Sequence, residues 1–64
     1  MIDFAHKLKV RTGVEKVHHS FSNDREESFL VSGRGYVMVA VVNKKTHVCT
    51  FYTTSGKYVK DIKL

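Results

Sequence analysis

Four histidines and a single cysteine are the residues of this 64-residue chain whose types could support metal binding or catalysis. His18 and His19 are adjacent, His6 lies upstream, and His47 and Cys49 lie in the C-terminal half. Zinc takes about four Cys or His ligands at recognisable spacings, and the sequence contains neither C-x-x-C nor H-x3-H. Adjacent side chains of a helix point about 100° apart and do not readily share one ion. We therefore expect no metal site and no cofactor.

Cys49 is the candidate nucleophile, but its position argues against that role. It lies within the β-branched and aromatic stretch HVCTFYTT (47–54). A reactive thiolate needs exposure and a positively charged neighbour, whereas a free cysteine in an apolar strand is usually buried. A histidine-based ribonuclease would need a second acid or base and a phosphate-binding group, and the spacing shows neither. We expect no catalytic residues and no small-molecule substrate, so the protein is not predicted to be an enzyme.

Positive charge is the clearest chemical signal in the sequence. Lys and Arg number 11 against 6 Asp and Glu, which gives a net charge of +5. This balance favours anionic partners, either nucleic acid or an acidic host protein, although it also serves solubility. Arg34 lies between two glycines, where it could grip phosphate or simply project from a hairpin turn. The candidate nucleic-acid-binding residues are Lys7, Lys9, Arg11, Lys16, Arg34, Lys44 and Lys45.

Length and composition limit the class of protein. We expect one domain over residues 1–64, near the lower limit for a self-sufficient core, because such a chain buries only about 60% of its unfolded surface. One cysteine rules out an internal disulfide and suits a reducing compartment. The start does not resemble a signal peptide, and no apolar run approaches about 20 residues. A cytoplasmic location is therefore expected, in the host cytoplasm if the protein is phage-encoded, with no membrane partner.

The C-terminal half reads as an antiparallel sheet. Short polar or glycine-containing segments, which are typical of turns, separate β-branched and aromatic stretches. Because these connections are short, successive strands should run antiparallel as a meander. The expected strands are SFLVS (28–32), YVMVAVVN (36–43), HVCTFYTT (47–54) and KYVKDIKL (57–64), with turns at GRG (33–35), NKKT (43–46) and SG (55–56).

The turn positions predict a register and therefore two faces. With Lys44-Lys45 at one hairpin tip, Val42 faces His47 and Ala40 faces Cys49. With Ser55-Gly56 at the next tip, the pairs are Thr53–Tyr58, Phe51–Lys60 and Cys49–Ile62. The first face, which should be the core, carries Tyr36, Met38, Ala40, Val42, Cys49, Phe51, Tyr58 and Ile62. The second face carries Val37, Val39, Val41, Val48, Tyr52 and Val59, with Thr50, Asp61 and Lys63 towards the last strand.

The second face raises a question of coverage, because a strand beside water should not be apolar on both sides. The N-terminal segment could cover it, or the sheet could curl into a barrel. Alternatively, a second chain could cover it, either as a homodimer or as a target protein. The last option makes this face the candidate protein interface, formed by Val37, Val39, Val41, Val48 and Tyr52.

The N-terminal half supports two interpretations. Residues 2–11 alternate apolar and polar side chains, which is a strand pattern, yet Phe4, Ala5 and Leu8 also fit a helical stripe. We favour a helix over residues 3–10. Thr12 and Glu15 have the spacing of a capping box, which predicts a second short helix over residues 13–21.

The expected fold is therefore α+β: a short N-terminal helical segment packed on a three- to four-stranded antiparallel meander. A small all-β barrel is the alternative. The expected function is non-enzymatic regulatory binding of DNA or RNA through phosphate contacts. The alternative is a small phage-type inhibitor that docks on a host protein or enzyme through the apolar sheet face or an edge strand.

Overall fold

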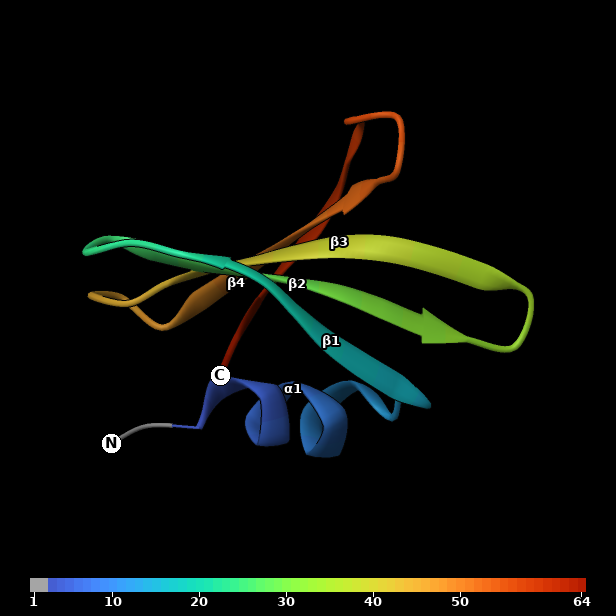
Figure 1. Ribbon diagram of the computed structural model, residues 1–64, viewed down its shortest axis with the longest axis horizontal. Helices are drawn as coiled ribbons and strands as arrows, with labels where there is room; N and C mark the ends of the chain where they lie inside the picture. The colour runs from blue at the N-terminus through green and yellow to red at the C-terminus, as the bar shows by residue number, and fades with distance from the viewer. Residues whose placement is uncertain (1–2) are drawn as a thin grey trace.

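The protein consists of one helix packed on an open antiparallel sheet of five strands, in a computed structural model that describes residues 3–64 (Figure 1). The fold is thus α+β, with five strands rather than the three to four expected. The order of strands in the sheet is the order in the chain, so β1 and β5 form its edges and it does not close as the alternative barrel would. The elements are α1 (Phe4–Thr12), β1 (Lys16–Ser22), β2 (Glu26–Gly33), β3 (Tyr36–Asn43), β4 (Val48–Thr53) and β5 (Tyr58–Lys63).

Helix α1 has a defined start and end. At its start the Asp3 side chain accepts a hydrogen bond of 3.1 Å from the backbone N–H of His6. At its end Gly13 adopts a left-handed φ of 71° and donates its N–H to the Lys9 carbonyl. The helix expected over residues 3–10 is therefore present, and the alternating pattern of residues 2–11 does not form a strand. Ile2, which belongs to that pattern, lies outside the described residues.

The prediction of a second helix over residues 13–21 is wrong, because most of this segment belongs to strand β1. Thr12 does not cap a new helix: its hydroxyl donates to the Leu8 carbonyl, 2.6 Å away, within the last turn of α1. Strand alternation in β1 is hidden by an irregularity between His19 and Phe21. This bulge breaks the two-residue alternation of a strand, so the helical spacing of Val14, Val17 and Phe21 is the stronger pattern in the sequence. The extra strand also explains the error in strand count.

The β3–β4 register differs from the prediction by two residues. Val42 pairs with Cys49 and Ala40 with Phe51, which places the tip at Lys45-Thr46. The Asn43 side chain sets this turn by accepting hydrogen bonds from the backbone N–H groups of Lys45 and Thr46. A shift of two residues preserves the faces. In the β4–β5 pair, the expected partners Phe51–Lys60 and Cys49–Ile62 are present.

One face of the sheet, here called the inner face, packs against α1 and forms the core. Phe4 and Leu8 of the helix lie one turn apart and are buried, as is Val14 in the connection to β1. Met38 and Ile62 are half-buried beside this core. The sheet contributes the buried side chains Phe29, Val31, Ala40, Val42, Cys49 and Phe51.

Two tyrosines expected in the core are exposed. Tyr36 is 41% exposed at the end of β3, opposite Gly33. Tyr58 is 61% exposed, because an irregularity between Phe51 and Tyr52 places Tyr58, rather than Val59, opposite Tyr52. Tyr58 therefore lies on the opposite side of the sheet from the core, where its hydroxyl donates to Asp61 at 3.3 Å.

Candidate binding surfaces

The exposed side of α1 is a basic surface. Its exposed side chains, here called the helix surface, are His6, Lys7, Lys9, Val10 and Arg11. No acidic residue occurs in the helix, whose sequence is FAHKLKVRT. The ion pairs within residues 3–64 are His19–Glu27 and Arg34–Glu15, so none of the helix cations is neutralised by a neighbouring carboxylate in that part of the chain.

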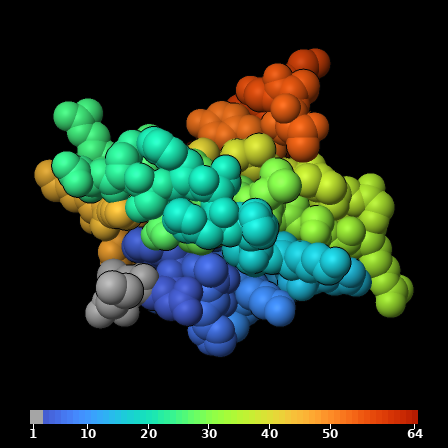
Figure 2. All heavy atoms as spheres, viewed as in Figure 1, coloured from blue at the N-terminus to red at the C-terminus, as the bar shows by residue number. Residues whose placement is uncertain are grey.

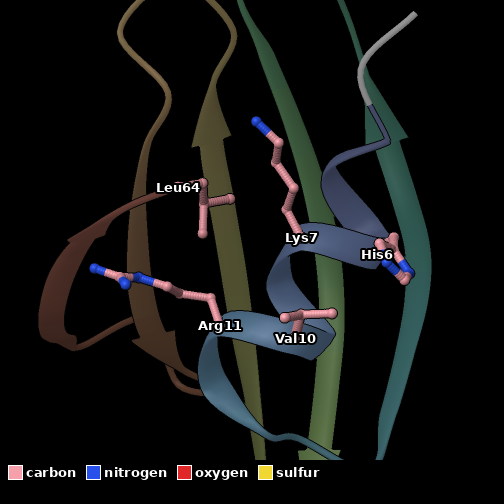
Figure 3. A pocket seen from close by; sticks show the side chains of 5 residues that line it. All are labelled: His6, Lys7, Val10, Arg11 and Leu64. Atoms are coloured by element: carbon pink, nitrogen blue, oxygen red, sulfur yellow. The ribbon is translucent and has the colours of Figure 1, made fainter.

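Lys7 and Arg11 line the same hollow beside α1. They lie four residues apart, which is about 6 Å along a helix. Both extend toward the side of the helix where Leu64 lies, while His6 lies on the other side (Figure 3). Together with Val10 these residues line a shallow hollow of about 280 Å³. Its floor is apolar and its rim is basic, because Val10 is 71% exposed and Leu64 is half-buried between the cations.

Lys9 points away from that pair, since side chains two positions apart in a helix differ by about 200°. The other candidate basic residues are also scattered. Arg34 is in the β2–β3 turn, where its Nε lies 3.5 Å from a Glu15 carboxylate oxygen. The β3–β4 turn carries Lys44 and Lys45 at the opposite end of β3, and Lys44 Nζ donates to Ser22 Oγ at 2.9 Å.

The face of the sheet opposite α1, here called the outer face, has no element covering it within residues 3–64. The five expected interface residues, Val37, Val39, Val41, Val48 and Tyr52, all lie on this face. Val37 is 47% exposed and Leu30 of β2, which pairs with Val39, is 42% exposed. Val39, Val41, Val48 and Tyr52 are half-buried. The N-terminal segment thus packs on the inner face, and on the outer face Val37 and Leu30 are the exposed apolar residues among these six.

A second hollow, of about 320 Å³, lies at one end of the outer face. Glu26, Asn43, Thr46 and Thr50 line it with polar groups, beside Val41, Val48 and Tyr52. Glu26 and Leu30 are not among the residues predicted from the sequence, because the predicted strand over residues 28–32 begins two residues after the start of β2 and the face predictions do not include it. The alternation of Phe29 and Val31 with Leu30 was the signal available for that assignment.

The histidines and Cys49 do not assemble a chemical centre in the described part of the chain. No three His, Cys, Asp or Glu side chains in residues 3–64 come close enough to hold a metal ion together. His47 packs edge-on against Phe4 and His19 against Phe29, with ring centroids 5.4 and 5.5 Å apart. Cys49 is fully buried, and burial together with the negative charge of Asp61 raises its pKa to about 12.

Comparisons of the chain with protein-family models, curated proteins and solved structures find no match. Within residues 3–64, α1 does not have the length or the apolar character of a membrane-crossing helix. The two candidate binding surfaces are the basic helix surface and the apolar outer face.

Proposed function

We propose that this protein is a non-enzymatic nucleic-acid-binding protein whose helix surface contacts phosphate groups. The observation that carries the proposal is the cluster of cations on α1 without an acidic residue or an ion-pair partner in residues 3–64. A regulatory role in the cytoplasm, or in the host cytoplasm if the protein is phage-encoded, is part of the proposal. The unpaired thiol of Cys49 suits that reducing compartment.

Lys7 and Arg11 are the expected main contacts. Their separation of about 6 Å along the helix allows them to contact neighbouring phosphates of one strand. The planar guanidinium of Arg11 can donate two parallel hydrogen bonds to a phosphate, and Lys7 acts as a point charge. Lys9, Lys16, Arg34, Lys44 and Lys45 lie outside this pair and would add weaker, longer-range attraction. Contacts of this type give affinity without choice of sequence.

Salt dependence tests the proposal directly. Fluorescence anisotropy with a labelled DNA duplex and a labelled single-stranded RNA would measure affinity at several salt concentrations. If three phosphates are contacted, affinity for duplex DNA should fall about 40-fold between 50 and 200 mM salt. Absence of binding to both probes at the lowest salt concentration would eliminate the proposal.

Charge reversal then tests the location. The double variant Lys7→Glu/Arg11→Glu should abolish binding, since both side chains are exposed and the fold does not depend on them. The matched control is Arg25→Glu/Lys57→Glu, which changes net charge by the same amount. Arg25 lies in the β1–β2 turn, and Lys57 in the β4–β5 turn, which projects on the side away from α1 (Figure 2). Equal losses in the two variants would show that net charge, not the helix surface, governs binding.

Docking on a host protein, as a small phage-type inhibitor, is the second candidate function. The uncovered outer face favours it, and the edge strand β5 offers a further route by strand addition. A pull-down from host lysate with and without nuclease separates the two functions. A protein that stays bound after nuclease treatment supports docking, and one that is lost with the nucleic acid supports the first proposal.

A further inference from the structure

The hollow beside α1 exposes apolar surface that the fold itself does not use. Val10 is 71% exposed, on the side of the helix away from Leu8, which is fully buried against the sheet. Leu64, the other apolar residue of the hollow, packs against the core, and its backbone N–H donates to the His47 carbonyl at 2.8 Å. The apolar floor is therefore formed by two residues whose backbones are anchored, and a ligand would find it already in place.

The charged side chains around this floor are all cationic. Lys7 and Arg11 extend toward the side of the helix where Leu64 lies (Figure 3). Among residues 3–64, no carboxylate side chain lines the hollow, and neither cation has an ion-pair partner. Charge complementarity therefore favours a ligand that carries two negative charges with an apolar group between them.

The size of the hollow limits that apolar group to one ring system. Its volume of about 280 Å³ lies just below the range of about 300–1,000 Å³ that holds whole drug-sized ligands. A nucleobase is a single flat ring system with an apolar face, and within a strand it has a phosphate on each side. The separation of about 6 Å between Lys7 and Arg11 along the helix suits phosphates that are neighbours in one strand.

Base pairing decides whether a base can reach the floor. In a duplex the bases are stacked inside, so Lys7 and Arg11 would contact phosphates while Val10 and Leu64 stayed in contact with water. In a single strand an unstacked base can turn away from its neighbours and pack on a protein surface. Covering the floor then adds an apolar contribution to the attraction between phosphates and cations.

We propose that the hollow binds one unpaired base of a single-stranded nucleic acid, with the phosphates on its two sides held by Lys7 and Arg11. The inference rests on the proposed function and narrows it from nucleic acid in general to single strands. The base packs against Val10 and Leu64. Because every base presents a ring face, the hollow accepts any of them, and the binding has no sequence preference.

Strands that differ only in having bases test the proposal. Fluorescence anisotropy would compare a labelled oligothymidine with an equally long strand of abasic sites, which carries the same phosphates. An aliphatic floor should hold a base less tightly than an aromatic one. The oligothymidine should therefore bind about fivefold more tightly, near the lower end of the range for base stacking on aromatic side chains. Equal affinities, with binding that falls as salt rises, would overturn the inference and leave the proposed function standing.

The variant Val10→Ser tests whether the floor causes this difference. Serine and valine have similar helix propensities, so this exposed substitution should leave α1 folded. It should remove most of the advantage of oligothymidine and leave affinity for the abasic strand and for a duplex of the same length unchanged. The matched control is Val59→Ser, which should change none of the three affinities. Val59 is 42% exposed on β5, near the β4–β5 turn that projects away from α1 (Figure 2).

Two further outcomes would overturn the inference. If Val10→Ser weakens binding to all three probes equally, the valine acts through the fold or the position of the cations and not through a base. If none of the probes binds at the lowest salt concentration, the proposed function is lost together with the inference. An acidic peptide with an apolar side chain, which offers a similar combination of charge and apolar surface, would then be the ligand to be sought.

Discussion

Burial decides what the single thiol of this protein can do. Cys49 is fully buried between β3 and β5, opposite Val42 and Ile62. Removal from water raises its pKa from 9.0 to about 12, and the nearby carboxylate of Asp61 adds to the effect. The thiol is therefore protonated at neutral pH, and it is not an activated nucleophile.

Alkaline pH should destabilise the fold through Cys49. Because its folded pKa lies above its unfolded value of 9.0, the contribution of the thiol to stability is complete below pH 9 and is lost as pH rises toward 12. Above pH 9 each further pH unit should cost up to about 1.4 kcal/mol. The thermal unfolding midpoint from about pH 8 to about pH 11 would measure this for the unmodified protein and for Cys49→Ala. Parallel pH curves would contradict the assignment to Cys49.

At the scale of single residues, the sequence alone predicts the burial of Cys49 but not the exposure of Tyr58. The burial of Cys49 follows from its place in an apolar strand, and the structure confirms it. The exposure of Tyr58 could not be predicted, because it depends on one irregularity in the β4–β5 pairing. Such bulges depend on how two paired strands pack against each other, and the local residue types do not predict them.

Helix α1 is held to the sheet by few side chains, so its anchor should be sensitive to truncation. Leu8 is fully buried, whereas Val10, in the same helix, is 71% exposed. Leu8→Ala should cost about 2–5 kcal/mol, which is comparable to the whole stability of about 3–5 kcal/mol expected for a domain of this size. Val10→Ala should change stability by less than about 0.5 kcal/mol. Urea unfolding followed by circular dichroism would measure both.

If the two variants unfolded at similar urea concentrations, the prediction would be contradicted, since the stability of the fold would then not depend on the buried side of the helix.

At the scale of elements, the strands from residue 28 onward could be predicted because alternation and turn residues agree. Residues 13–21 could not, because Val14, Val17 and Phe21 fit a helical stripe as well as a bulged strand. Tertiary pairing of Val17 with Val31 decides between the two.

At the scale of the whole molecule, the two sheet faces differ in what they tolerate. Val42 is fully buried on the inner face, and Val39, three residues earlier, lies on the outer face. Val42→Asp should unfold the protein, because an unpaired carboxylate would enter the core. Val39→Asp should leave the far-ultraviolet circular dichroism spectrum unchanged while weakening any contact made by the outer face. Unfolding by both variants would show that the outer face is covered within the monomer.

The membership of each face could be predicted from the sequence for β3 and β4, although not for Tyr58 of β5, and the side that α1 covers could not be predicted. Alternation along β3 places Val37, Val39 and Val41 on one face in any register. A register shift of an even number of residues also keeps Val48 and Tyr52 of β4 on that face. The covered side depends on where Gly13 ends the helix and on the direction in which the chain enters β1. The gathering of Lys7 and Arg11 on one side of the helix surface depends in the same way on the helix being anchored through Leu8.

The match between strand order in the sheet and strand order in the chain has a consequence for folding kinetics. Every strand pairs only with its chain neighbours, so the sheet closes short loops one hairpin at a time, at low entropic cost. The docking of α1 is different, because Phe4 meets His47 across most of the chain. The chain also contains no proline, which removes prolyl isomerisation as a slow step. Refolding should therefore be fast and free of slow phases, with the helix joining a sheet that has already assembled.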